Sequence, residues 1–407
     1  MSGILFLAHR PPFPPDRGDK IRSHHVLRAL SAMAKVHVGC LGETIADRAA
    51  ESELAELAES HCLALRDKPL VVAGIEALLQ GEPVSLAAFR HPGLAAWVRD
   101  TLAREEIDTI YVFSGQMGQY VPDDWAGRLI VDLVDVDSAK FEAYSRGNRT
   151  PAGWINRREA RLLAREETRL ASLADRTLLV SEAERALFLS RIPPDCGTKV
   201  AVLGNGIDAA RFDPARSSPH PALATSGPHI VFTGQMDYPP NVIAGLRAIE
   251  RLMPRIRSTY PTAQFHLVGR SPASELVALD GENGARIWGE VPDVRPFLAG
   301  ADVVLVPLTI ARGVQNKVLE AMAMACPLVL TPAAAAGIRG QDGVHFALAE
   351  TDEALAGAVR SLLARRGSAR ALGQAARRLV AESMSWPAIL APLPAIVGRA
   401  KAQRDAA

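Results

Sequence analysis

The segment from residue 301 to residue 331 constrains the fold more than any other part of the chain. It reads ADVVLVPLTIARGVQNKVLEAMAMACPLVLT. The run Val303 to Leu308 is apolar throughout, which is typical of a parallel strand buried on both faces. Apolar residues at helical spacing follow from Val318 to Ala325, and a second apolar run, Leu328 to Leu330, resumes a strand. The segment therefore predicts a strand, loop, helix and strand of a parallel sheet.

The loop and first helical turns between these two strands carry residues suited to a ligand. Gly313 permits close backbone approach, while Lys317 and Glu320 fall in the first turns of the helix. Open α/β sheets bind ligands at the carboxyl ends of their strands, and free N–H groups at a helix start bind phosphates. This predicts a diphosphate site in which the carboxylate binds a ribose diol. The alternative is an ordinary αβ unit with a solvated Lys and Glu.

Composition excludes several classes of protein. A length of 407 residues suffices for two domains, each with its own core. The formal net charge of +1 argues against a nucleic-acid binder, which would present a basic face. The four cysteines lie far apart with no metal-ligand spacing, so we expect reduced thiols in a cytoplasmic protein and no zinc site. Residues 321–338 are uncharged, but Pro327 and Pro332 divide them, which favours helix, turn and strand over a membrane span.

Strand and helix signals alternate on both sides of a segment rich in Gly, Pro, Ser and Asp. The predicted strands are Ile4–Ala8, Val36–Cys40, Thr109–Phe113, Leu129–Leu133, Thr177–Val180, Ile230–Thr233, Gln264–Val268, Ala285–Trp288, Val303–Val306 and Pro327–Leu330. The predicted helices include His25–Met33, Ala46–Glu59, Pro92 toward Arg104, Asn156–Leu173 and Trp386–Val397. Such alternation predicts an α/β protein with two Rossmann-like, doubly wound parallel-sheet domains that face a ligand-binding cleft. We expect one domain over residues 1–205, a linker over 206–228, a second domain over 229–384 and a C-terminal helix over 385–407.

A charged turn follows the first predicted strand. It contains Arg17, Gly18, Asp19 and Lys20 directly before a helix. The dinucleotide fingerprint GxGxxG is absent from this turn, so an NAD-dependent enzyme is disfavoured. The charges instead predict an anionic or polyhydroxylated partner, and the alternative is a solvated, proline-rich turn.

The matching strand ends of the second domain are also polar. Gly234 and Gln235 follow one strand, and we expect Asn241 to cap the helix behind them and leave its first N–H groups free for a phosphate. Arg270 follows the next strand, where a guanidinium suits a diphosphate or is a surface cation.

Two sets of charged residues allow more than one interpretation. Asp132, Asp135 and Asp137 surround the end of a strand, where carboxylates act as a general base, grip sugar hydroxyls, bind Mg²⁺ or serve as turn and cap residues. Four arginines recur at four-residue spacing from Arg157 to Arg169, and we interpret them as a solvated helix face. Weak adhesion to an anionic membrane is the alternative.

Taken together, these motifs resemble two-domain glycosyltransferases of the GT-B fold, in the large retaining family 4 group. The resemblance is carried by TGQMDYPPN, HLVGR, IWGEVPDVRPFLAGADVVLVPL and GVQNKVLEAMAMACPLV, by the linker NGID, and by the tail SWPAILAPL. In that family the tail is a final helix that crosses back onto the first domain. HRPPFPPDRGDKIR and DLVDVDSAKFEAY further resemble sugar transferases of exosortase (PEP-CTERM) exopolysaccharide loci.

The resemblance implies a function and a set of site residues. The function is transfer of a sugar from a nucleotide-sugar to a glycan or lipid-linked acceptor, in the cytoplasm or at the inner face of the membrane, with no metal or other cofactor and no nucleic acid. The implied donor-binding residues are Gly234, Gln235, Asn241, Arg270, Ile287, Val291, Gly313, Val314 and Glu320. The implied catalytic residues are Asp135, Asp137, Arg312 and Lys317. The implied acceptor-binding residues are Arg17, Gly18, Asp19 and Lys20.

The chain departs from the family pattern at two places. The family has two glutamates in the donor helix region, and Arg312 stands where the first would be. The usual Arg and Lys that follow the first strand of the second domain are replaced by Gln235 and Asn241, so Arg312, Lys317 and Arg270 are the candidates to supply the positive charge. These departures keep two alternatives open: a nucleotide-sugar 2-epimerase, and a non-catalytic nucleotide-sugar binder or assembly scaffold.

Overall fold

The computed structural model divides the chain into two compact units, and each is described by itself. The first unit comprises residues 1–204 and 390–407, and the second comprises residues 205–389. The structure describes residues 2–15, 17–146, 150–225, 227–311 and 314–399. Within these ranges, no helix combines the length and the apolar character needed to cross a bilayer.

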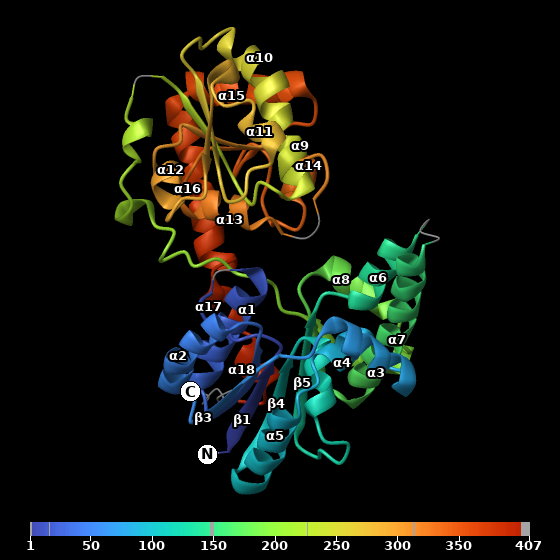
Figure 1. The fold of residues 1–407 in the computed structure, drawn as a ribbon. Helices are drawn as coiled ribbons and strands as arrows, with labels where there is room; N and C mark the ends of the chain where they lie inside the picture. Colours follow the sequence, from blue (N-terminus) through green and yellow to red (C-terminus); the bar gives the residue numbers. More distant parts are fainter. Residues whose placement is uncertain (1, 16, 147–149, 226, 312–313, 400–407) are drawn as a thin grey trace, which may run out of the picture. The chain divides into compact units, whose positions relative to one another are not determined.

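The first unit is built on a seven-stranded parallel sheet with the order β3-β2-β1-β4-β5-β6-β7 (Figure 1). Its strands are β1 (Gly3–Ala8), β2 (Val36–Gly42), β3 (Ser60–Leu65), β4 (Ile107–Phe113), β5 (Arg128–Val134), β6 (Arg176–Leu179) and β7 (Val200–Val202). Its helices are α1 (Gly18–Ser31), α2 (Ala50–Leu57), α3 (Leu70–Gln80), α4 (Val84–Ala88), α5 (Pro92–Arg104), α6 (Asp137–Ser145), α7 (Pro151–Leu173), α8 (Glu182–Leu189) and α18 (Leu393–Ile396). The strand order reverses between β1 and β4, so the loops after these two strands meet at the switch point where such sheets bind ligands.

The second unit is built on a six-stranded parallel sheet with the order β10-β9-β8-β11-β12-β13. Its strands are β8 (His229–Thr233), β9 (Gln264–Val268), β10 (Ala285–Gly289), β11 (Val303–Val306), β12 (Leu328–Leu330) and β13 (Ala347–Leu348). Its helices are α9 (Pro239–Arg247), α10 (Met253–Arg257), α11 (Ser274–Val277), α12 (Arg295–Ala299), α13 (Asn316–Ala323), α14 (Pro332–Ala335), α15 (Asp352–Ala364) and α16 (Arg366–Ser383), and α17 (Trp386–Leu390) leads out of the unit. The switch point lies between β8 and β11.

Two parallel sheets flanked by helices confirm the predicted α/β class. Strands β8, β9 and β11 are fully or almost fully buried, as their apolar runs indicated. The helix predicted from Pro92 toward Arg104 is α5, and Ser181 caps α8 by accepting a hydrogen bond from Glu184 N.

Several element predictions were wrong in detail. The first helix begins at Gly18 and not at His25, because the charged turn before it already has helical geometry. The segment Trp386–Val397 is two short helices, α17 and α18, because prolines at 392 and 394 interrupt a single helix. Strand β3 and helix α3 were not predicted, since β3 is only half-buried and lacks an alternating pattern.

A buried ion pair joins the first helix of the first unit to its sheet. Arg22 Nε and Nη2 each donate to Asp132 at 3.0 Å, and the Tyr111 hydroxyl donates to the same carboxylate at 2.9 Å. Both charged side chains are almost fully buried, and Arg22 Nη1 also donates to Gly204 O at 2.8 Å. The Asp132 carboxylate is therefore a structural part of the core, where a buried charge is stable only when it is paired and hydrogen-bonded in this way.

The last described residues, near Ile396 and Arg399, pack against the first unit. Arg128 Nε donates to Ile396 O at 2.9 Å, and Arg399 Nη2 contacts Asp108 Oδ1 at 2.6 Å. Arg399 Nη2 also donates to the carbonyl of Ser2 at 3.1 Å. These contacts fix the last described residues beside β1 and β4.

Glu159 is expected to be a stabilising residue of the first unit. Its buried carboxylate accepts hydrogen bonds from Val84 N at 2.8 Å, Ser85 N at 2.9 Å and Ser85 Oγ at 2.7 Å, and so caps α4 from α7. Glu159→Ala leaves these donors without their acceptor, and we expect it to lower the free energy of unfolding by about 2 kcal/mol. Urea denaturation measures this, with the exposed Glu56→Ala as the control. Equal midpoints in the two variants would contradict the capping role.

Candidate functional site

Two glycine loops approach each other at the carboxyl edge of the second unit's sheet. Gly234 follows β8 and Gly269 follows β9, and Gly234 N donates to Val268 O at 3.0 Å. A Cβ atom added to Gly269 would lie 1.5 Å from Gly234 O, so a larger residue at this position would displace the backbone. The sequence needs glycine here because the two loops touch, and the result is partly exposed backbone at a strand end.

Lys317 lies against this glycine edge. Its Nζ donates to Asn241 Oδ1 at 2.6 Å, and Asn241 Nδ2 donates to Gln235 O at 2.7 Å. A Cβ atom on Gly234 would lie 3.1 Å from Lys317 Cε and 3.0 Å from Asn241 Nδ2. These two hydrogen bonds connect α13, α9 and the loop after β8, and they hold the Lys317 ammonium group close to the backbone of Gly234. A side chain at position 234 would crowd Lys317 and Asn241.

The electrostatics of Lys317 differ from those of a surface lysine. Burial lowers its pKa to about 8, while the charge of Glu320 opposes that shift. Its Nζ also lies 5.3 Å from the centroid of the Phe232 ring. A partly desolvated ammonium gains more from an anionic ligand than a solvated one does.

The prediction that Asn241 caps α9 was wrong. Helix α9 begins at Pro239, and Tyr238 precedes it without a side-chain cap, so Asn241 is the third helical residue. Pro239 starts the helix earlier because its fixed φ suits the first helical position. The Asn241 side chain is buried and holds Lys317 and the Gln235 carbonyl.

Glu320 lies near the middle of α13, three residues after Lys317 and therefore on the same helix face. Burial raises the pKa of its carboxyl to about 7, whereas Lys317 and Arg211 favour the charged form. Within the described ranges, no side chain or backbone group hydrogen-bonds to this carboxylate. A partly buried carboxylate without an internal donor is suited to accept hydrogen bonds from a ligand.

The other predicted donor-binding residues lie on β10 and in the loops at the carboxyl ends of the strands, in the same unit as Lys317 and Glu320. Arg270 is exposed, and its Nη2 donates to Gln235 Oε1 at 3.1 Å. Ile287 lies on β10, an edge strand of the sheet, and Val291 follows that strand; both are partly buried against the core. Val314 is partly buried before α13, and its Cγ2 would be 3.0 Å from a Cβ on Gly337. Arg312 and Gly313 lie outside the described residues.

The predicted acceptor residues of the first unit divide into two groups. Asp19 contacts Arg10 at 2.6 Å and His9 at 3.3 Å; burial would raise its pKa, but hydrogen bonds from His9 and Arg10 outweigh this and hold it well below its usual range. Arg17 is exposed and lies 3.8 Å from Glu43, and Gly18 begins α1.

Lys20 belongs to the second group because it is buried. Its Nζ lies 3.4 Å from Asp47 Oδ1 and donates to Phe13 O at 3.4 Å. The structure thus brings Arg17, Gly18 and Asp19 to the surface of the turn and directs Lys20 inward. An ion-pair network of Glu43 with Arg10 and Arg66, at 2.9 and 3.5 Å, completes this edge. Glu43 was not singled out because it follows a separate strand.

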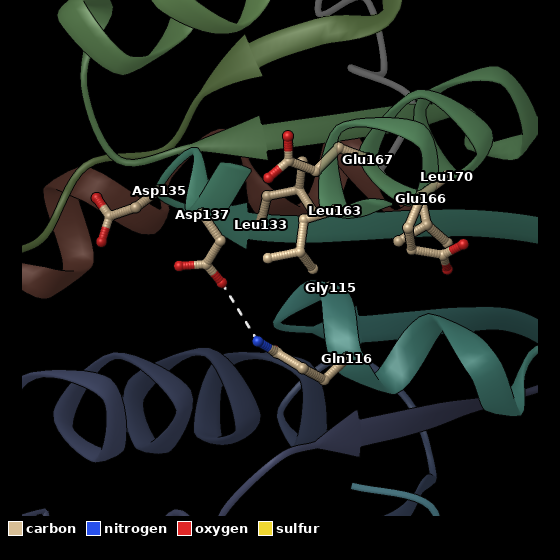
Figure 2. Close-up of a pocket in the computed structure, with 9 residues that line it drawn as sticks. All are labelled: Gly115, Gln116, Leu133, Asp135, Asp137, Leu163, Glu166, Glu167 and Leu170. Atoms are coloured by element: carbon tan, nitrogen blue, oxygen red, sulfur yellow. Dashed lines mark hydrogen bonds between the residues drawn. The ribbon is translucent and has the colours of Figure 1, made fainter. Parts of the chain in front are cut away.

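Asp135 and Asp137 lie at the end of β5, on either side of the start of α6 (Figure 2). Gln116 Nε2 donates to Asp137 Oδ2 at 3.2 Å. Partial burial, and then the charges of Glu184 and Asp137, raise the pKa of Asp135. Asp132, in contrast, is held by Arg22, so the three aspartates do not form one set. Within the described residues, no group of three or more His, Cys, Asp or Glu side chains is placed to hold a metal ion.

Backbone strain marks this edge of the first unit. Val134, immediately before Asp135, has φ of 68°, and Ser114 at the end of β4 has φ of 77°. A positive φ is unfavourable for a β-branched residue, and strained residues of this kind cluster at functional sites. Both flank the loop ends that carry Asp135 and Gln116, and the sequence gives no signal for either.

A small hollow lies under these residues and is lined by Gly115, Gln116, Leu133, Asp135, Asp137, Leu163, Glu166, Glu167 and Leu170 (Figure 2). Its volume is about 10 Å³, which holds about one water molecule and no sugar ring. The hollow lies next to Asp135 and Asp137 and is too small to be a substrate pocket.

Glu167 in this hollow predicts a pH dependence of stability. Ser138 N and Oγ donate to its carboxylate at 2.8 and 2.5 Å, but burial dominates and raises its pKa to about 7. The folded state then binds the proton more tightly than the unfolded state, so the stabilisation is complete below about pH 4.5 and is lost as pH rises through 7.

We expect Glu167→Gln to flatten that dependence. The free energy of unfolding, measured by urea titration at about pH 5 and about pH 8, should fall less with pH in the variant than in the unmodified chain. Glu166→Gln, one residue away and paired with Arg169, is the matched control. An unchanged slope in Glu167→Gln would show that this carboxyl titrates normally.

The comparisons with known proteins agree with this architecture. The structure of Anabaena Alr3699/HepE in complex with UDP and glucose matches 98% of this chain and 100% of its own, with a TM-score of 0.65 and 16% identity. Sucrose-phosphate synthase from Thermosynechococcus elongatus matches 97% of this chain and 98% of its own, with a TM-score of 0.63 and 17% identity. The chain has the GT-B fold. The predicted fold is thereby confirmed, and the facing of its two domains across a cleft stays a prediction.

Sequence similarity is concentrated in the second unit of this GT-B chain. Residues 227–365 match the family model described as Glycosyl transferases group 1. Glycogen synthase of Mycobacterium tuberculosis is 25% identical over an alignment of 248 residues, and the match covers 58% of this chain and 57% of that protein. The chain thus matches little more than half the length of this curated relative. The family model covers the two glycine loops, Lys317 and Glu320.

Proposed function

We propose that this chain is a retaining glycosyltransferase that moves a sugar from a nucleotide-sugar to a glycan or lipid-linked acceptor. The observation that supports this best is the Lys317 ammonium, held by Asn241 at 2.6 Å beside the glycine backbone of the second unit's switch point. The departing diphosphate develops negative charge in the transition state, and a fixed cation with nearby amide groups stabilises it. The match of residues 227–365 to glycosyl transferases supports the same conclusion.

We propose a role for each of the candidate donor-site residues. Lys317 and Arg270 neutralise the diphosphate, Glu320 accepts hydrogen bonds from the ribose diol, and Ile287 and Val291 border the base. Gly234, Gln235, Asn241, Gly313 and Val314 shape the backbone around the phosphates, and Arg312 remains a candidate third cation.

On the acceptor side, the raised pKa of Asp135 makes it a better proton acceptor than an ordinary aspartate. We propose that Asp135, with Asp137, faces the reacting hydroxyl and that Arg17, Gly18, Asp19 and Lys20 form the acceptor edge. We also propose that transfer needs no metal ion, since Lys317 supplies the positive charge that a metal ion would otherwise bring.

The biological setting is part of the same proposal. The N-terminal motifs support exopolysaccharide biosynthesis of the PEP-CTERM type, in the cytoplasm with peripheral contact at the inner face of the membrane. HepE was solved with UDP-glucose, so UDP-sugars are the first donors to examine.

A thermal-shift screen against UDP-, GDP- and ADP-sugars tests donor binding. A ligand that binds only the folded chain raises its melting temperature by mass action, and a concentration of about 100 times Kd adds about 2.7 kcal/mol. Product analysis with and without acceptor then separates the outcomes. Transfer with an unchanged anomeric configuration supports the proposal, and free sugar formed without acceptor indicates an epimerase. Binding without turnover indicates a scaffold, and no shift with any nucleotide-sugar would overturn the donor site.

A further inference from the structure

Helix α3 of the first unit exposes its large apolar side chains and buries its small ones, the reverse of an ordinary amphipathic helix. Its buried positions are the small residues Ala73 and Ala77, which pack on Ala87 and Ala88. Its large apolar side chains point to solvent instead: Leu70, Val71, Val72, Ile75, Leu78 and Leu79. Of these, Leu70, Val71 and Leu79 are 70%, 75% and 83% exposed. An exposed apolar patch of this kind marks an interaction site.

A basic stripe on α7 borders this apolar helix. Arg158 Nη2 donates to Ala77 O at 2.7 Å and its Nη1 donates to Glu82 O at 2.9 Å, so α7 lies against the C-terminal end of α3 (Figure 1). Trp154, Arg161 and Arg165 stand four residues before and three and seven residues after Arg158, which places them along the same side of α7. All three are exposed, and within the described ranges nothing pairs with Arg161 or Arg165.

The acidic groups near this surface are already neutralised. Glu76 on α3 contacts Lys68 at 2.6 Å, and Glu82 is paired with Arg90. Glu159 is buried as the cap of α4. The surface formed by α3 and by residues 154–165 of α7 therefore presents apolar side chains, an indole and uncompensated guanidinium groups.

We propose that this surface binds an anionic lipid bilayer, with α3 lying in the interface. An 11-residue helix is about 16 Å long, too short to span the hydrocarbon core but suited to lie in the headgroup region. Apolar side chains enter the acyl boundary, the Trp154 ring occupies the interface, and the arginines bind lipid phosphates. This locates the membrane contact of the proposed function and rests on that proposal for the identity of the membrane.

Charge favours a bilayer over a second copy of the chain. In a two-fold symmetric dimer the same patch meets itself, so the arginine stripe of one copy would approach that of the other. An anionic bilayer instead supplies counter-charges to every arginine, and its fluid boundary accepts apolar side chains without a complementary shape. Lys and Arg near such a surface are each attracted to anionic lipid.

Vesicle co-sedimentation of the full chain tests the proposal without any sugar transfer. We expect the unmodified chain to sediment with phosphatidylglycerol-containing vesicles and much less with pure phosphatidylcholine vesicles. Val71→Glu/Leu79→Glu changes only exposed side chains of α3 and should reduce binding at least about tenfold. Arg161→Gln/Arg165→Gln should weaken binding and remove most of its dependence on salt.

Matched variants serve as controls. Ile45→Glu/Val277→Glu adds the same charge at exposed apolar positions elsewhere, and Arg99→Gln/Arg104→Gln removes exposed arginines from α5. Both should bind vesicles like the unmodified chain. Equal binding by the α3 variant and its control would overturn the proposal. A dimer in sedimentation velocity that the α3 variant dissociates, with no vesicle binding by either, would assign the surface to a second copy instead. Donor thermal shifts remain a separate readout, so failure here leaves the transferase proposal intact.

Discussion

Lys317→Met is expected to lower kcat/KM for sugar transfer by about 10²–10³-fold, the range for loss of one preorganised charge-stabilising group. The side chain is held by Asn241 at 2.6 Å and lies beside Gly234, so removal of its charge leaves the diphosphate site without its fixed cation. Methionine keeps the length and the apolar contacts of the stem. Steady-state kinetics with the donor found in the thermal-shift screen measure the effect.

Two variants make this test specific. Lys199→Met removes a partly exposed lysine of the first unit, whose Nζ donates to Ser172 O, and should leave the rate unchanged. Lys317→Arg retains the charge and should recover part of the activity. If Lys317→Met transferred sugar at the normal rate, the central claim about charge stabilisation would be wrong.

Lys317 also predicts how donor binding responds to alkaline pH. Since burial lowers its pKa to about 8, the ammonium loses its proton as pH rises through that value, and donor affinity should decline there. In Lys317→Arg the guanidinium stays charged, so this alkaline decline should disappear.

Glu320→Ala is expected to raise the donor Kd by about 10²–10⁴-fold, because two hydrogen bonds to a charged acceptor contribute about 1.5–3 kcal/mol each. The carboxylate lies on α13 with no hydrogen bond from the described residues, so its removal should cost the fold little. The thermal shift produced by the donor should vanish while the melting temperature of the free chain stays close to normal.

Glu320 also predicts how donor affinity changes at acid pH. Burial raises the pKa of Glu320 to about 7, so the carboxylate becomes protonated below that value and ceases to accept both ribose hydroxyl groups. With Lys317, this predicts a bell-shaped dependence of donor affinity that is highest between about pH 7 and about pH 8. Glu320→Gln should abolish the acid limb only. An intact donor shift in Glu320→Ala would remove this residue from the ribose role.

Much of the fold is predictable from the sequence because parallel strands buried on both faces must be continuous apolar runs. The runs at Val303–Val306 and Gln264–Val268 are strands β11 and β9 as predicted. Helix α3 was not predicted, and only its packing shows that its alanines face inward while its large apolar side chains are exposed. The start of α9 was wrong because Pro239 began the helix before Asn241.

The candidate site shows the same division. Loop glycines, Lys317 and Glu320 are identifiable as residues because strand ends and helix starts are local features of the chain. Their partners are not: the Asn241 bond to Lys317 joins residues 76 positions apart, and Arg22 reaches Asp132 across 110. Lys20 and Arg17 look alike in sequence, yet one is buried against Asp47 and the other is exposed.

The sequence by itself determined the α/β class, the two alternating halves and the strand ends at which polar residues collect, because hydrophobic periodicity and glycine placement are local properties. Only the tertiary structure decided which of those polar groups can bind a ligand and which are already paired with other groups inside the protein. It also decided which carboxyl and ammonium groups carry shifted pKa values. Burial and charge pairing depend on residues brought together from distant parts of the chain, and no local pattern encodes them.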